Sequence, residues 1–105
     1  MKYLDLFSYM DYRLFLADYY SARKLVDLKF SYRFFAKQAG YSSSGLYVNI
    51  VNAKLNLSER YLSGFISALK LSLNEAVYFK LMVDYTHAQS DDDREMIFDQ
   101  MVPYV

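Results

Sequence analysis

Residues 30–54, FSYRFFAKQAGYSSSGLYVNIVNAK, decide the fold that this chain is expected to adopt. The stretch reads as a short helix that Ser31 begins and Gly40 ends, a serine-rich turn, and a second short helix. Ala36 is small enough for the second helix to cross the first, and Gly40 tolerates the positive φ that the bend requires. The stretch therefore predicts a helix-turn-helix at residues 31–52. The second helix is expected to be capped by Ser42, Ser43 or Ser44.

The second helix of this pair can be placed in two registers. The tightest spacing buries Leu46 and Asn49, whereas one extra residue in the turn buries Tyr47 and Ile50. We prefer the second register, because it buries two apolar side chains instead of an amide that would need a hydrogen-bond partner. The side chains that it leaves facing outward are those of Val48, Asn49 and Asn52.

A longer helix is predicted before this pair. It is expected to begin after Ser8 or Asp11, either of which can cap it, and to run to about Leu25. Its apolar stripe, at helical spacing, consists of Tyr12, Phe15, Leu16, Tyr19 and Tyr20. Its charged residues lie off the stripe and are expected to be solvated: Arg13, Asp18, Arg23 and Lys24.

Three further helices are predicted after the pair. Ser58 caps the first, Ser72 and Glu75 form a capping box for the second, and Asp91 caps the third. Pro103 stops the last helix. The residues that these helices turn inward are Leu62, Phe65, Ile66 and Leu69, then Ala76, Phe79 and Val83, then Ile97, Phe98 and Met101.

Composition predicts one all-α domain over residues 1–105, a bundle of five to six short helices. Three Gly and one Pro leave few sharp turns, and the absence of Cys excludes disulfides and thiolate metal sites. Neither a signal peptide nor a membrane-length apolar run is present, so the chain is expected to be cytoplasmic and off the membrane. It stops shortly after Pro103 without a polar tail, which suggests the N-terminal fragment of a longer protein.

Charge is unevenly distributed although the formal net charge is zero. Between Leu28 and Ser58 every charged residue is positive, namely Lys29, Arg33, Lys37 and Lys54. The last fifteen residues are acidic instead, with Asp91, Asp92, Asp93, Glu95 and Asp99. A neutral total therefore conceals a basic face and an acidic end.

The stretch from about Phe30 to Phe79 resembles the repressor-like helix-turn-helix family, which includes the phage repressors and Cro. The resemblance rests on Gly40 followed by serines, a short helix that closes in Asn52-Ala53-Lys54, a further capped helix, and the sequence LSLNE at 71–75. It implies a five-helix domain that binds operator DNA, with the helix from Ser43 to Asn52 in the major groove. Ala53 stands where that family usually has Gly.

A narrower resemblance covers nearly the whole chain. The strings DYRLFLADYYSARK, FSYRFFAKQAGYSS, KLNLSERYL and LNEAVYFKLMV are similar to the N-terminal part of an uncharacterised bacterial paralogous family best known from Fibrobacter. Members of that family are usually described as regulators with a larger C-terminal domain of unknown role. The resemblance therefore implies a front module that contacts a missing C-terminal domain.

Double-stranded DNA is the partner that these features favour. Asn can bind adenine through two hydrogen bonds, and Val can touch a thymine methyl group. The expected base contacts are Ser43, Ser44, Val48, Asn49 and Asn52. The expected phosphate contacts are Lys29, Arg33, Lys37 and Lys54.

A protein–protein interaction or dimerisation module that does not bind DNA is the alternative. Twelve Tyr exceed what a core of this size can fully bury. They could be exposed at an interface, including a homodimer through the first helix, or they could lie half-buried around a small core. An enzyme is disfavoured, because the only His, His87, has no nucleophile at a suitable spacing. The acidic run at 91–93 lacks the pattern of a calcium loop, so neither a metal nor a cofactor is expected.

Overall fold

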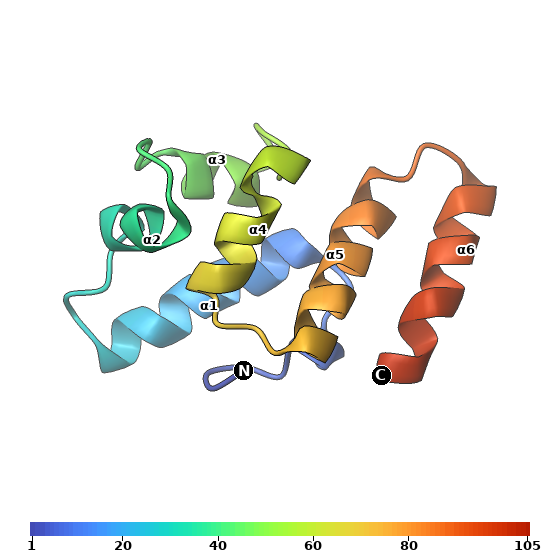
Figure 1. Ribbon diagram of the computed structural model, residues 1–105, viewed down its shortest axis with the longest axis horizontal. Coiled ribbons are helices and arrows are strands. Elements are labelled where there is room, and N and C mark those ends of the chain that lie inside the picture. The colour runs from blue at the N-terminus through green and yellow to red at the C-terminus, as the bar shows by residue number, and fades with distance from the viewer.

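The chain folds into six α-helices and two short 3₁₀-helices without any β-strand, in a computed structural model that describes residues 1–105. The predicted all-α bundle is therefore confirmed. In chain order the elements are η1 (Leu6–Ser8), α1 (Tyr12–Val26), α2 (Tyr32–Ala39), α3 (Leu46–Val51), α4 (Glu59–Ala68), α5 (Leu73–His87), α6 (Asp91–Met101) and η2 (Val102–Tyr104) (Figure 1).

Side-chain caps fix where most helices begin. Asp11 caps α1, Ser31 caps α2, and Ser72 forms the predicted capping box with Glu75 at the start of α5. For α6 the cap is Ser90, whose hydroxyl accepts from the Asp93 N–H at 3.1 Å, and not the expected Asp91. Ser58 occupies the N-cap position of α4 without a side-chain hydrogen bond. Local hydrogen bonding thus sets the element boundaries.

The helix α1 runs through the middle of the bundle and contacts both α3 and α5 (Figure 1). Four residues of its predicted stripe are buried, and Tyr20 is half-buried against the same core. The buried four are Tyr12, Phe15, Leu16 and Tyr19. Because α1 meets helices on both sides of the molecule, it joins the α2–α4 part to the α5–α6 part, together with the direct contact between α4 and α5.

The sequence suggested that the charged residues of α1 are solvated. Several of them instead contact other parts of the protein. The Asp18 carboxylate accepts from the Tyr9 hydroxyl at 2.7 Å, and the Lys24 ammonium donates to the Phe30 carbonyl at 2.5 Å. The Arg23 guanidinium lies 4.1 Å from the centroid of the Phe30 ring. Long polar side chains can lay their stems on apolar surface and still reach distant acceptors, which helical periodicity does not reveal.

The helices α2 and α4 approach each other at Gly64. A Cβ placed on Gly64 would overlap the backbone carbonyl oxygen of Ala39. A backbone atom cannot swing aside as a side chain does, so the two helices pack at this distance only because residue 64 is glycine.

The tyrosines form part of the core boundary. All twelve are buried or half-buried, and none is exposed. Of the two arrangements that the sequence left open, half-buried tyrosines around a small core are therefore the one observed. Their rings pack in a network, for example Tyr20 stacked on Tyr32 with centroids 3.9 Å apart. Such rings enlarge a small core, and some of their hydroxyls bond to backbone carbonyls inside the bundle, as that of Tyr47 does to Leu16.

The helix α6 packs along α5 at one end of the molecule (Figure 1). Of its three residues predicted to turn inward, Met101 is buried, Ile97 is half-buried and Phe98 is exposed.

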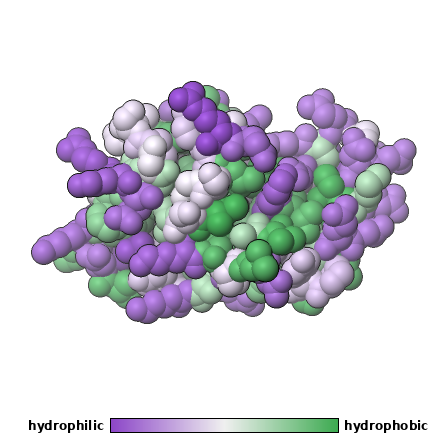
Figure 2. Space-filling model, viewed as in Figure 1, coloured by the Kyte–Doolittle hydropathy of each residue, from purple (hydrophilic) through white to green (hydrophobic).

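The surface along α5 is partly apolar, between hydrophilic side chains (Figure 2). Leu73 and Val77 are the exposed apolar residues of that helix.

Candidate nucleic-acid interface

The turn between α2 and α3 begins at Gly40. This residue adopts the left-handed conformation with φ 82°, and its N–H donates to the Ala36 carbonyl at 2.9 Å. The Tyr41 N–H donates to the same carbonyl at 3.0 Å, which closes the last turn of α2. The prediction that Gly40 ends this helix is confirmed, and its physical basis is the positive φ.

The helix α3 is seated by the two side chains of the preferred register. Tyr47 and Ile50 are both 0% exposed, and the Tyr47 hydroxyl donates to the Leu16 carbonyl of α1 at 2.5 Å. Burial raises the pKa of Tyr47 well above its ordinary value, so the hydroxyl keeps its proton. Leu46 is buried as well, whereas Asn49 is half-buried. The preferred register is confirmed.

No serine caps α3, contrary to the prediction. Gly45 occupies the N-cap position, and no side chain accepts a hydrogen bond there. The turn is longer than a serine cap would require, so Ser43 and Ser44 precede the cap and are exposed. The backbone N–H groups of residues 42–45 donate to no other backbone group. The turn therefore presents both hydroxyls and amides to solvent.

The side chains of Ser43 and Asn49 converge around Gly45. The Ser43 Oγ and the Asn49 Nδ2 each lie 3.9 Å from the point where a Cβ would stand on Gly45. Both candidate base contacts therefore lie beside Gly45, at a distance that would be ordinary van der Waals contact for a Cβ. The remaining three lie on or next to α3, with Val48 half-buried and both Ser44 and Asn52 exposed.

The loop after α3 folds back onto that helix. The N–H groups of Lys54 and Leu55 donate to the Asn49 carbonyl, at 2.8 and 3.1 Å. Ala53 adopts a positive φ of 60°, a conformation that glycine adopts more readily. As a result Lys54 lies beside the end of α3.

Arg13 of α1 holds this loop in place. Its Nη1 donates to the Ile50 carbonyl at 2.5 Å and to the Leu55 carbonyl at 2.9 Å, and its Nη2 donates to the Asn56 Oδ1 at 2.7 Å. The planar guanidinium is suited to several acceptors at once. This role could not be predicted from the sequence, because the acceptors are mainly backbone carbonyls far along the chain.

The four predicted phosphate contacts are all exposed, and none belongs to an ion pair. Lys54 adjoins α3 as described, and Lys37 adjoins the turn. No hydrogen bond connects the side chain of Lys29 or Arg33 to the turn or to α3. A backbone hydrogen bond therefore places Lys54 beside α3, and Lys37 lines the same cavity as Ser42 of the turn. Lys29 and Arg33 lie on the exposed surface of α2 and of the loop before it.

Arg60 is a further cation at this surface, and the sequence analysis missed it. A cavity of about 530 Å³ between the end of α2 and the start of α4 is lined by Lys37, Ser42, Arg60 and Tyr61, among others. The Arg60 guanidinium lies 5.3 Å from the centroid of the Tyr61 ring. The uninterrupted basic stretch ends at Ser58, just before Glu59, and for this reason Arg60 fell outside it.

His87 makes structural contacts within the bundle. Its Nε2 lies 2.9 Å from the Tyr12 hydroxyl, which accepts from the Leu57 N–H at 3.2 Å. The same nitrogen is 3.5 Å from the Arg13 Nη2. Burial, and then the charge of Arg13, lower the pKa of His87, while Asp84 opposes them. A neutral imidazole here joins α5 to α1 and to the loop before α4.

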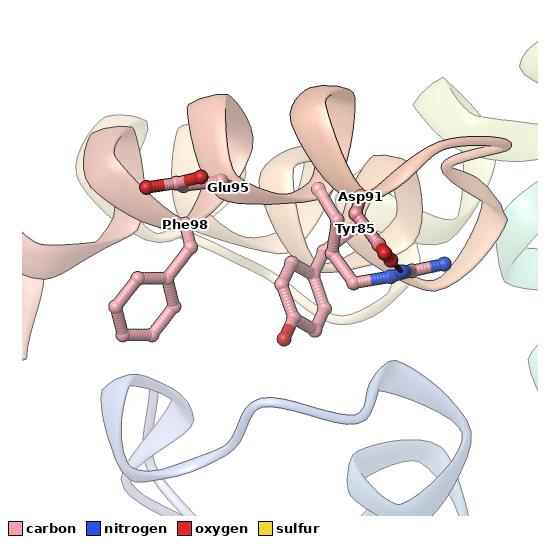
Figure 3. Close-up of a pocket in the computed structure, with 5 residues that line it drawn as sticks. Tyr85, Asp91, Glu95 and Phe98 are labelled. Atoms are coloured by element: carbon pink, nitrogen blue, oxygen red, sulfur yellow. Dashed lines mark hydrogen bonds and ion pairs between the residues drawn. The ribbon is translucent and has the colours of Figure 1, made fainter.

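The space between α5 and α6 contains a second cavity, of about 300 Å³ (Figure 3). The rings of Tyr85 and Phe98 point to the same side of it, with centroids 6.3 Å apart. Arg94 pairs with the Asp91 carboxylate at 2.8 Å and donates to the Ala88 carbonyl at 3.2 Å. Arg94 and Asp91 therefore satisfy each other within the protein, whereas the exposed Glu95 has no ion-pair partner.

No group of three or more His, Asp or Glu side chains is arranged so that it could hold a metal ion. None of the six α-helices combines the length and the apolar character that crossing a bilayer requires.

Comparison with known proteins gives no relative. No protein-family model, no curated protein and no solved structure gives a significant match to this chain.

Proposed function

We propose that this chain is the DNA-binding module of a bacterial transcriptional regulator, acting in the cytoplasm. In this proposal α2, the turn and α3 form a helix-turn-helix, and α3 enters the major groove. The observation that carries it is the run from Leu28 to Ser58, in which every charged residue is an exposed cation without an ion-pair partner. Unpaired cations beside a helix are what a phosphate backbone attracts.

The outward side chains of α3 suit base recognition. Asn49 and Asn52 carry amides that can pair with adenine, and Val48 can contact a thymine methyl group. Ser43 lies next to Asn49 at Gly45 and adds a hydroxyl. Arg13 and the buried Tyr47 bind α3 to α1. The helix that carries these outward side chains is therefore held in one orientation. Such preorganisation reduces the entropy cost of binding.

Phosphate contacts are assigned to Lys29, Arg33, Lys37 and Lys54, with Arg60 added from the structure. Five neutralised phosphates imply a slope of about −4 to −5 for the logarithm of affinity against the logarithm of salt concentration. This is modest for one protomer. High affinity for one operator would therefore require a homodimer or a C-terminal domain.

The proposal is tested by fluorescence anisotropy of the chain against a pool of random duplexes at about 50 and about 200 mM salt. The double reversal Arg33→Glu with Lys37→Glu should weaken binding at every sequence, because it places like charge against phosphates. The matched control is Lys2→Glu with Lys80→Glu, which changes net charge equally in other parts of the chain. Asn49→Ala should reduce discrimination between sequences while leaving random-duplex affinity nearly unchanged.

Absence of binding at the lower salt concentration would refute the proposal. Equal loss of affinity in the test pair and in the control pair would mean that only net charge matters, and it would refute the assigned orientation.

A protein–protein interaction module is the second candidate, and exposed aliphatic side chains at the corner between α1 and α2 favour it. Leu25 is 84% exposed, Leu28 is 81% exposed, and Val26 lies between them at 70%. An apolar group of this kind is typical of an interface. Because it extends from the end of α1, a homodimer through this corner is the simplest arrangement.

Light scattering after size exclusion tests this second candidate. The chain should show a dimer that Leu25→Ser with Leu28→Ser abolishes, while Leu73→Ser, at another exposed leucine, should not. A monomer at all concentrations would argue against the homodimer.

A further inference from the structure

A third cavity lies away from the proposed DNA-binding surface. It has a volume of about 190 Å³ and is bounded by the N-terminal segment, α1 and the end of α4. Figure 1 shows the N-terminal segment and the α4–α5 connection along the edge of the molecule opposite to α3. A duplex bound to α3 would therefore leave this cavity open.

The lining of the cavity carries positive charge without compensation. Lys2, Arg23 and Lys70 line it, and no acidic residue does. None of the three takes part in an ion pair. The nearby ammonium group of Met1 is already paired with Glu75 at 2.5 Å. Three cations around a partly enclosed space produce a field that favours an anion.

Arg23 is held firmly but is not fully satisfied. Its Nη1 donates to the Tyr19 hydroxyl at 3.2 Å, and its guanidinium lies 4.1 Å from the Phe30 ring centroid and 5.4 Å from that of Tyr3. Its Nε is buried and has no hydrogen-bond partner. Because this Nε is closed off from the surface, the donor that a ligand could use is Nη2, which has no acceptor within the protein. A phosphate or carboxylate is the acceptor whose geometry matches a guanidinium.

Lys70 is placed at the cavity by a strained backbone. It follows the C-cap residue Leu69 of α4, and its φ is 56°, in the left-handed region. Glycine is the usual residue at this position because a Cβ is unfavourable there. A lysine in this conformation therefore lowers stability relative to glycine while it brings an ammonium group to the cavity. Strain of this type is typical of functional positions.

We propose that this cavity binds a small molecule through a phosphate or carboxylate group, which Lys2, Arg23 and Lys70 contact and beside which the Tyr3 ring lies. The volume is below that of a drug-sized pocket, so the ligand is a small metabolite and not a polymer. This function is separate from DNA binding and does not depend on it.

The test is titration of the chain with inorganic phosphate, and separately with citrate, at constant ionic strength, followed by amide chemical shifts in NMR. Saturable shifts are expected at residues 2–3, 23 and 70 with at least one of the two anions. Saturation by phosphate alone would assign a phosphate group to the ligand, and saturation by citrate alone would assign carboxylates. Either result supports the proposal, and saturation by neither refutes it.

Lys70→Gly provides the decisive variant, because binding and stability should change in opposite directions. Loss of one charge-assisted contact should weaken anion binding about tenfold. Relief of the positive φ should raise the midpoint of urea unfolding. Lys80→Met removes the same charge from the exposed face of α5, and it should leave anion binding unchanged. Arg23 is left intact, because it also packs on Phe30.

Two results would overturn the proposal. The first is unchanged anion affinity in Lys70→Gly. The second is evidence that the anion binds on the surface around α2 and α3 instead. Loss of the anion-induced shifts in Arg33→Glu with Lys37→Glu would be such evidence, and so would competition between the anion and duplex DNA. Failure of DNA binding alone would leave the cavity proposal standing.

Discussion

At the scale of single residues, Gly64 is a position where the packing leaves no space for a side chain. Alanine there gains about 1 kcal/mol of helix propensity. Its Cβ would overlap the Ala39 carbonyl oxygen, however, and overpacking of this kind costs about 3 kcal/mol. We expect Gly64→Ala to lower the free energy of unfolding by roughly 2 kcal/mol, measured by urea denaturation.

Gly45→Ala is the matched control for this substitution. Its new Cβ would meet its nearest neighbours, Ser43 and Asn49, at 3.9 Å, and the φ of Gly45 is −84°. Both are ordinary for alanine, so stability should change by no more than about 0.5 kcal/mol. Equal stability of the two variants would show that α2 and α4 do not pack as described.

The residues of the candidate site differ in how far sequence could identify them. Lys29, Arg33, Lys37 and Lys54 stand out because charge is visible in the sequence. Gly40 stands out because few residues accept its backbone conformation. The side chains of Ser43 and Asn49 both lie beside Gly45. This could not be predicted from the sequence, because it depends on where α3 begins.

At the scale of elements, helical periodicity and capping patterns located all six α-helices. The start of α1 follows from Asp11 and that of α5 from the Ser72 capping box, because these caps are local in sequence. The start of α3 was misjudged, since the seating of Tyr47 and Ile50 against the core sets it instead of a serine. Tertiary packing overrides capping propensity in a helix of six residues.

The connection between α1 and the α3 loop leads to a prediction for Arg13. Arg13→Met should lower the free energy of unfolding by about 2 kcal/mol, because the guanidinium donates to three acceptors. It should also accelerate hydrogen exchange at the amides of Lys54 and Leu55, which pack back onto α3. Arg33→Met, at an exposed arginine, should change stability by at most about 0.5 kcal/mol. Unchanged exchange in Arg13→Met would show that the loop is held by its backbone alone.

At the scale of the whole molecule, contacts between segments that are distant in the chain could not be predicted from the sequence. His87 meets the neighbouring residues Tyr12 and Arg13 although it lies 75 and 74 residues away from them in the chain, and no periodic pattern encodes that contact. The aromatic content was visible, but its arrangement as a half-buried network was not. Composition and periodicity therefore specify an all-α bundle, whereas the cavities depend on how the helices are placed.

The burial of His87 against Tyr12 and Arg13 makes the free energy of unfolding depend on pH. The pKa of His87 is lower in the folded state than its unfolded value of about 6.5. The unfolded state therefore binds the proton first, and stability is lost as pH falls through about 6.5 toward the folded pKa. We expect the urea midpoint to decrease between about pH 7.5 and 5.5.

His87→Gln is the control for this effect, because glutamine can still bond to the Tyr12 hydroxyl without titrating. Its urea midpoint should change less than that of the parent chain over the same pH range. Glu75, whose pKa is lowered, contributes at lower pH and does not interfere. A parent chain that is equally stable at both pH values would contradict the prediction.

The packing of α4 on α2 also has a consequence for sequence comparison. Surface positions of this chain can vary without altering the backbone, and even core residues can exchange among apolar types. Residue 64 cannot vary in this way, because any side chain would separate the two helices. Homologues that preserve this arrangement are therefore expected to retain glycine at the equivalent position, where it would serve as a diagnostic for aligning otherwise divergent sequences.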